Sequence, residues 1–134
     1  MVIDSSALVA ILLEETESDR FLRAIDASDV RLVSAMTKLE TGMVMIGRGG
    51  TGVIPEIDLL LAKIAATIVP FDEQQADLAR DAFVRFGKGR HKAGLNFGDC
   101  ATYALAILEA EPLLFKGTDF GATDVEVAAL PAAE

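Results

Sequence analysis

The stretch MVIDSSALVAILLEE, Met1 to Glu15, decides the fold. Its first three residues are apolar, Asp4 follows them, and apolar residues then continue at helical spacing. This order predicts a short buried strand, a polar junction at Asp4 and a helix. No basic segment precedes the apolar residues, so the stretch does not have the form of a secretory signal peptide.

The same alternation of short apolar runs and longer helical patterns continues along the chain. It predicts an α/β domain with a mostly parallel sheet, in which strands covered on both faces are almost wholly apolar. The predicted strands are Met1 to Ile3, Val30 to Val33, Thr67 to Val69, Leu113 to Phe115 and Val125 to Val127.

Five further segments carry apolar residues at three- and four-residue spacing, which indicates helices. Glycines 47, 49, 50 and 52 interrupt the pattern between the second and the third of them, so these two helices are expected to form a hairpin. The predicted helices are Glu17 to Ala27, Ala35 to Arg48, Ile54 to Ala66, Glu73 to Phe86 and Phe97 to Ala110.

Length and composition limit the classes of protein that fit. A chain of 134 residues is the size of one domain, and we expect a single domain over residues 1–130 followed by a loose tail, 131–134. The net charge of -9 argues against broad electrostatic coating of nucleic acid, so any such contact must be local. With one cysteine and no apolar run of the ~18 residues that a membrane span needs, a soluble cytoplasmic protein is expected.

Four acidic residues lie near the junctions between predicted strands and helices: Asp4, Glu40, Asp99 and Asp119. In an open parallel sheet such junctions gather at the carboxyl edge of the strands, where these folds bind ligands. Each acid alone is equally well explained as a helix cap. The segment Thr37 to Glu40 has the form of a capping box, and Asn96 to Asp99 resembles one.

Four carboxylates in one cleft repel one another and raise their own pKa values unless a cation neutralises them. Magnesium or manganese suits such a site, and activation of water for phosphodiester hydrolysis is the chemistry that needs it. Asp4 and Asp99 are predicted to bind the metal directly, and Glu40 and Asp119 to bind it directly or through water. Ser6 is a candidate partner of a carboxylate or of a substrate phosphate, or is simply an exposed hydroxyl of the first helical turn.

A basic segment, Arg85 to Lys92, leads to Asp99 and could supply the local contact with nucleic acid. Its alternative role is a solvated loop whose cations favour the end of the preceding helix. The candidate substrate-binding residues are Arg85, Lys88, Arg90 and Lys92. The single histidine, His91, excludes a histidine-rich zinc site, and Cys100 fits a small core residue better than a nucleophile.

Three motifs and one acid of this chain together resemble the PIN-domain signature, and more narrowly the VapC toxins of bacterial type II toxin-antitoxin modules. The motifs are Val2 to Leu8, Gly94 to Cys100 and Leu113 to Phe120, and the acid is the helical Glu40. The resemblance runs from residue 1 to about 127. The family often has an acid or asparagine where this chain has Thr118.

The resemblance implies a three-layer α/β/α sandwich and a Mg²⁺- or Mn²⁺-dependent endoribonuclease with Asp4, Glu40, Asp99 and Asp119 as its acidic residues. It also implies a homodimer that a small VapB-type antitoxin inhibits, with DNA contacted only through that antitoxin. Two other functions stay open from the sequence. One is a flavodoxin-like phosphoacceptor domain using Asp72 and Lys116, and the other is a catalytically silent interaction module of the same fold.

Overall fold

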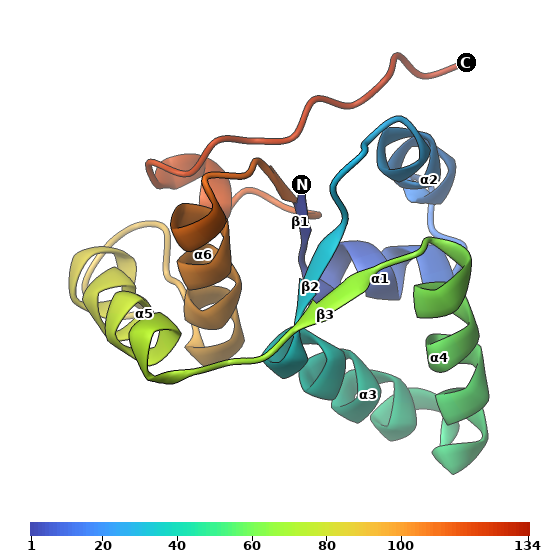
Figure 1. The fold of residues 1–134 in the computed structure, drawn as a ribbon, viewed down its shortest axis with the longest axis horizontal. Coiled ribbons are helices and arrows are strands. Elements are labelled where there is room, and N and C mark those ends of the chain that lie inside the picture. Colours follow the sequence, from blue (N-terminus) through green and yellow to red (C-terminus); the bar gives the residue numbers. More distant parts are fainter.

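Four short strands form the centre of the computed structural model, which describes residues 1–134 (Figure 1). Their order across the sheet is β3-β2-β1-β4, and every neighbouring pair is parallel. The predicted parallel sheet is therefore confirmed. The strands are β1 (Val2–Ile3), β2 (Leu32–Ser34), β3 (Thr67–Val69) and β4 (Leu113–Leu114).

Successive residues of each strand face opposite sides of the sheet and enter two separate hydrophobic cores. Ile3 and Leu114 are fully buried in the larger core, whereas Val2 and Leu113 are fully buried in the smaller one. Two residues each of β1 and β4 thus suffice to attach a layer of helices to each face, which explains why these two strands are short and wholly apolar.

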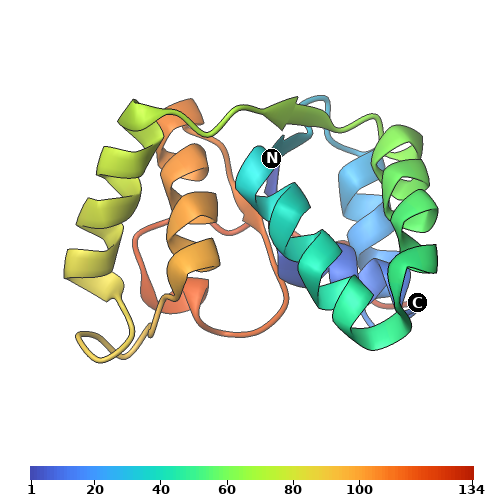
Figure 2. The same cartoon turned by 90° about the horizontal axis from the view of Figure 1, so that it is seen from below.

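The helices form the two outer layers, so the predicted α/β/α sandwich is confirmed. Helices α5 and α6 pack against each other on one side of the sheet, and α1 to α4 lie on the other (Figures 1 and 2). Short 3-10 turns, η1 (Thr51–Val53) and η2 (Phe120–Ala122), complete the structure. The helices are α1 (Ser5–Leu12), α2 (Ser18–Asp26), α3 (Ala35–Gly49), α4 (Ile54–Lys63), α5 (Glu73–Phe86) and α6 (Phe97–Glu109).

Side-chain caps fix where the helices begin. The Asp4 carboxylate accepts a hydrogen bond from the Ser6 backbone N–H at the start of α1, and Ser34 does the same for Met36 at the start of α3. At α6, Asn96 and Asp99 form a complete capping box, as their spacing predicted. Because β1 and β2 run directly into capped helices, α1 and α3 both begin at the carboxyl edge of the sheet.

Two sequence predictions are wrong. Val125 to Val127 is not a strand, because only one isolated bridge, between Leu113 and Val127, joins it to β4. The segment Thr37 to Glu40 is not a capping box either. Ser34 caps α3, and Glu40 therefore lies in the second turn of the helix with its carboxylate directed to another element.

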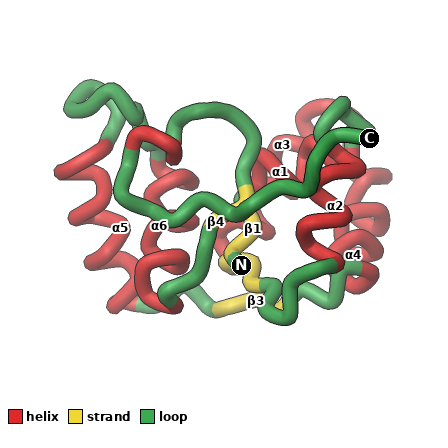
Figure 3. Tube along the Cα trace, turned by 90° about the horizontal axis from the view of Figure 1, so that it is seen from above, coloured by secondary structure: helices red, strands yellow, loops and turns green.

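The chain after β4 crosses the end of the sheet and finishes beside α2 (Figure 3). There the Arg20 side chain donates to the Pro131 carbonyl at 2.9 Å, and Arg23 donates to the Ala132 carbonyl at 3.0 Å. The division of the chain at residue 130 stays a prediction. None of the helices has the length and apolarity required to cross a membrane.

Candidate active site at the carboxyl edge of the sheet

Asp4 is the most buried carboxylate of the chain, with 2% of its surface exposed. Its Oδ2 accepts hydrogen bonds from the Ser6 N–H at 3.0 Å and from the Ser6 hydroxyl at 2.7 Å. Its Oδ1 accepts from the Thr102 hydroxyl at 2.8 Å. Charge-assisted hydrogen bonds of this kind hold a carboxylate in one orientation and compensate for its burial. The Ser6 hydroxyl also accepts from the Lys116 N–H at 2.9 Å, which ties the segment after β4 to Asp4.

A chain of buried hydroxyl groups supports Asp4 from behind. The Thr102 hydroxyl donates its single proton to Asp4. The Thr37 hydroxyl, 3.1 Å away, is therefore the donor in the Thr37–Thr102 hydrogen bond. Both threonines are almost fully buried, on α3 and α6 respectively. Thr37 on α3, Thr102 on α6 and Asp4 at the end of β1 are therefore joined in one hydrogen-bonded chain, and this chain fixes the orientation of the Asp4 carboxylate.

Replacing Thr102 by valine should destabilise the protein by about 1–3 kcal/mol, because Asp4 Oδ1 and the Thr37 hydroxyl both lose a buried partner. Valine matches threonine in shape, so the loss reports the hydroxyl and not the packing. The measurement is urea unfolding, with Thr16→Val at an exposed position as the control. Equal stability of the two variants would contradict this account of Asp4.

Glu40 reaches the site from the second turn of α3. Its Oε1 accepts a hydrogen bond from the Ser5 hydroxyl at 2.6 Å. Burial raises the pKa of Glu40 above its ordinary value and the charge of Asp4 raises it further, although the hydrogen bond from Ser5 opposes both. Its other oxygen, Oε2, packs against the backbone of Gly98, where a Cβ atom would lie only 2.0 Å away. A side chain at residue 98 would therefore force the Glu40 carboxylate out of this position.

Asp99 is the third carboxylate, and it lies in the first turn of α6. Its Oδ2 accepts from the Asn96 N–H at 3.0 Å, and Oδ1 has no hydrogen-bond partner. Burial raises the pKa of Asp99 to about 6 against the lowering effect of the Asn96 hydrogen bond, and the charges of Asp4, Glu40 and Asp119 add to the rise. The four predicted acids thus influence one another electrostatically at one edge of the sheet.

The four acids differ in how they enter the site. Asp119 is exposed and precedes η2 without a side-chain capping bond, so its carboxylate is free to move. No group of three or more acidic, histidine or cysteine side chains is arranged closely enough to hold a metal ion without adjustment.

The donor set nevertheless fits a hard divalent cation. Asp99 Oδ1 and Glu40 Oε2 make no hydrogen bond within the protein. Burial disfavours the charged form of both carboxylates and raises both pKa values. Magnesium prefers such oxygen ligands and usually retains several waters, so it needs only one or two carboxylates to be close.

The raised pKa of Asp99 predicts a pH-dependent stability. The folded state binds the Asp99 proton more tightly than the unfolded chain does, so the metal-free protein should lose stability as the pH rises from about 4 to about 6. Since magnesium competes with that proton, it should raise the melting temperature more at pH 7.5 than at pH 5. Thermal unfolding at both pH values checks this, and an equal magnesium effect that persists in Asp99→Asn would contradict it.

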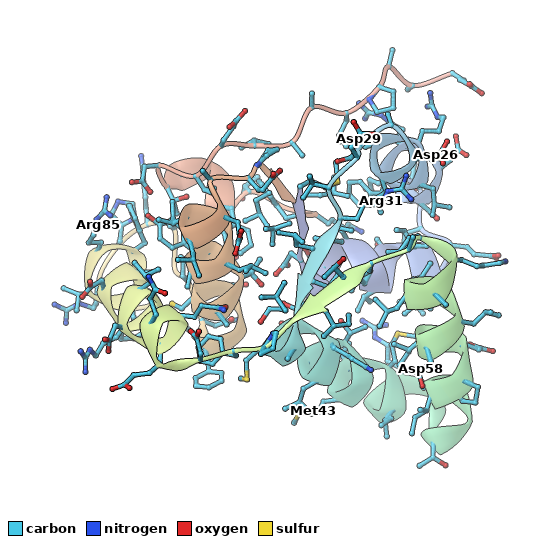
Figure 4. The ribbon with its side chains drawn as sticks, viewed as in Figure 1. Asp26, Asp29, Arg31, Met43, Asp58 and Arg85 are labelled. Atoms are coloured by element: carbon cyan, nitrogen blue, oxygen red, sulfur yellow. The ribbon has the colours of Figure 1, made fainter.

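The basic segment between α5 and α6 is less committed to the site than the acids are. The Arg85 guanidinium pairs with Asp124 at 3.0 Å and lies over the Phe86 ring, at the outer side of α5 (Figure 4). Arg90 donates to the Val84 carbonyl, whereas Lys88 and Lys92 are exposed and form no ion pair. Contact of these cations with nucleic acid stays a prediction.

The pair of residues required for a phosphoacceptor domain does not assemble. Asp72 caps α5 after β3, and Lys116 pairs with Glu15 and Glu17 after β4. These two strands are the opposite edges of the sheet. Cys100 is a buried core residue, and burial raises the pKa of its thiol to about 11, so it is no nucleophile.

The comparison with known families agrees with this geometry. The model of the PIN domain matches residues 1–126. The chain therefore belongs to the PIN-domain family.

Within that family the chain is similar to VapC proteins. It is 49% identical over 131 residues to Ribonuclease VapC30 of Mycobacterium tuberculosis, covering 98% of this chain and all of that one. It is also 49% identical over 125 residues to the Ribonuclease VapC of Mycolicibacterium smegmatis, covering 93% of this chain and 97% of the relative. This chain is thus a PIN-domain protein of the VapC type.

Solved structures support the fold. The crystal structure of VapC20 of Mycobacterium tuberculosis, described as a Sarcin-Ricin loop cleaving toxin, superposes with a TM-score of 0.77. That match covers 97% of this chain and 98% of the other at 16% identity. A toxin-antitoxin complex from Klebsiella pneumoniae superposes with a TM-score of 0.69 at 18% identity, covering 92% of each chain.

Proposed function

We propose that this protein is the toxin of a type II toxin-antitoxin module, an endoribonuclease that hydrolyses RNA phosphodiester bonds with the help of magnesium. The relatives named ribonuclease support the reaction. The observation that carries the metal requirement is the gathering of the Asp4, Glu40 and Asp119 charges around the Asp99 carboxylate. Burial chiefly, and these charges in addition, raise the pKa of Asp99 to about 6, and a divalent cation would relieve the repulsion.

Asp4 and Asp99 would hold the metal, with Glu40 and Asp119 binding it directly or through water. A bound divalent cation would supply positive charge for the phosphate and lower the pKa of the attacking water. Among the acids, Glu40 is the best placed to accept a proton from that water. Its Oε2 has no hydrogen-bond partner, and its raised pKa brings it closer to neutral pH, which favours proton transfer. Asp119 is exposed and would add negative charge that attracts the cation.

RNA cleavage with and without magnesium tests this proposal. We expect no cleavage in a chelator, full recovery on adding excess magnesium, and recovery with manganese as well. Unreduced cleavage in the chelator would contradict the metal requirement. A catalytically silent interaction module would show no cleavage in either condition, and calorimetry would detect no magnesium binding that Asp99→Asn removes.

We also propose a VapB-type antitoxin and a second copy of this chain as partners, with DNA contacted only through the antitoxin. The hairpin of α3 and α4 offers an apolar surface. Leu39, Met43 and Leu59 are more than half exposed, and Met43 projects outward from α3 (Figure 4). A cavity of about 380 Å³ between the two helices adds to it. Exposed apolar surface of this kind is typical of protein interfaces.

The cytoplasm is the compartment that we propose for this protein. Its one cysteine is buried and forms no disulfide, and RNA, its proposed substrate, is found in that compartment.

A further inference from the structure

Asn96 lies beside Asp99 in an orientation that two hydrogen bonds fix. Its side-chain oxygen, Oδ1, accepts from the Asp99 N–H at 2.9 Å, and the Asn96 N–H donates to Asp99 Oδ2 at 3.0 Å. Because the amide oxygen faces the start of α6, the NH2 group of the same side chain points the other way. That group makes no hydrogen bond within the protein, and the residue is exposed. Asn96 therefore presents free donor hydrogens next to a carboxylate of the proposed active site.

The other side-chain donors that contact the acids are already engaged. Ser5, Ser6 and Thr102 each donate their hydroxyl proton to one of the carboxylates. The Lys116 ammonium, although its backbone is bonded to Ser6, is paired with two glutamates between α1 and α2. The hydroxyl groups thus have no proton left for a substrate, and the ammonium is held by its own counter-ions. Asn96 offers a neutral donor that no acid occupies.

We propose that the Asn96 NH2 group donates a hydrogen bond to a non-bridging oxygen of the phosphate that is cleaved. This inference rests on the proposed function, because it assumes that the phosphate of an RNA substrate reaches Asp99. Since Asp99 and Asn96 are joined by two hydrogen bonds, a phosphate held at Asp99 lies beside Asn96 as well. Hydrolysis increases the negative charge on these phosphate oxygens, and a donor that is fixed in advance stabilises that charge in the transition state.

The first test separates the capping role of Asn96 from the proposed donor role. Aspartate caps a helix as well as asparagine does and glycine nearly so, but neither side chain carries a donor at neutral pH. We therefore expect Asn96→Asp and Asn96→Gly to keep melting temperatures near that of the wild type and to lose roughly 10²-fold in kcat. One variant adds a charge and the other does not, so either of them decides if its partner fails to fold. Full activity in a folded variant would overturn the inference.

The matched control makes the same exchange at another helix. Asp72 caps α5 by accepting a hydrogen bond from the Gln75 N–H at 3.0 Å, and it lies outside the proposed active site. Asp72→Gly should therefore leave kcat unchanged. If it lowered kcat as much as Asn96→Gly does, loosening the start of a helix would be enough to explain both losses, and the donor role would be wrong.

The substrate side of the contact is tested with RNA in which sulfur replaces one or the other non-bridging oxygen of the scissile phosphate. Sulfur is a weak hydrogen-bond acceptor. One of the two isomers should therefore lose little further activity in Asn96→Gly, because the contact is already absent. A variant that loses the same factor with the normal RNA and with both isomers would overturn the inference. Failure of the wild type to cleave any RNA in magnesium would instead contradict the proposed function, and this inference would fall with it.

A binding measurement gives a readout that does not depend on cleavage. In an Asp99→Asn background, the nuclear magnetic resonance signals of the Asn96 NH2 group can be assigned by their loss in Asn96→Asp. We expect these signals to move downfield when RNA binds, as a donor to a charged oxygen does. Signals that stay in place while the rest of the spectrum reports saturation with RNA would overturn the inference.

Discussion

Replacing Asp99 by asparagine is expected to abolish RNA cleavage and at the same time to stabilise the metal-free protein. The catalytic loss should reach about 10³-fold or more, because charge stabilisation by a metal contributes several kcal/mol and each 1.36 kcal/mol corresponds to a factor of ten. Asparagine keeps an oxygen that can accept from the Asn96 N–H, so the start of α6 should stay intact.

The gain in stability follows from the raised pKa of Asp99. At neutral pH the carboxylate is ionised against the effects of burial and of three neighbouring acids, and a neutral amide removes that cost. With about half of the shift discounted for solvent screening, we expect roughly 1–2 kcal/mol and a melting temperature a few degrees higher.

Cleavage assays and thermal unfolding at pH 7.5 in a chelator test both parts of this expectation. Asp81→Asn, which removes an exposed charge on α5, is the control and should leave activity unchanged. Asp4→Asn is a poorer test, because its amide NH2 would face hydrogen-bond donors from Ser6 or Thr102. If Asp99→Asn were less stable than the wild type, the electrostatic account of the site would be wrong.

The second large effect is expected from a single methyl group at Gly98. A Cβ atom there would lie 2.0 Å from Glu40 Oε2 and 2.4 Å from its carboxyl carbon. Gly98→Ala therefore forces Glu40 or the start of α6 to move. Displacing a catalytic group by about 1 Å can cost 10²-fold in rate. The loss of stability should be smaller, because the atoms in the way are the end of a flexible side chain.

The matched control for Gly98→Ala is Gly47→Ala, because both glycines are helical and a Cβ at residue 47 meets nothing within 4 Å. That variant should be neutral or slightly stabilising, since alanine favours a helix more than glycine does. The double variant Gly98→Ala with Glu40→Ala separates the two effects. It should recover stability without recovering activity, and a loss of stability that persists would place the strain elsewhere.

Much of the fold could be predicted because the sequence pattern matches the local structure. Val2 and Ile3 face opposite sides of the sheet and are both apolar, as a strand covered on both faces should be. Asp4 and Asn96 are residue types that commonly cap helices. The segment Val125 to Val127 has the same apolar character, but nothing in its residues indicates that it makes only one bridge to β4. Pairing with a sheet depends on distant chain segments that a local pattern does not report.

The acids of the site were visible in the sequence, whereas the residues that orient them were not. Ser5, Thr37 and Thr102 hold Glu40 and Asp4, yet a serine or threonine on a helix usually faces solvent. Only the packing of α3 against α1 and α6 reveals which hydroxyl groups are buried. Glu40 shows the converse error, since a capping pattern at Thr37 concealed that its carboxylate points to Ser5.

The buried hydroxyl chain from Thr37 through Thr102 to Asp4 also makes this site observable in solution. Protons shielded from water in this way exchange slowly, so the two threonine hydroxyl protons should give resolved nuclear magnetic resonance signals where exposed hydroxyl protons give none. Their chemical shifts report the charge on Asp4 directly. A cation that binds the opposite side of that carboxylate would therefore change the chemical shifts of the Thr37 and Thr102 hydroxyl protons, although neither residue contacts the cation.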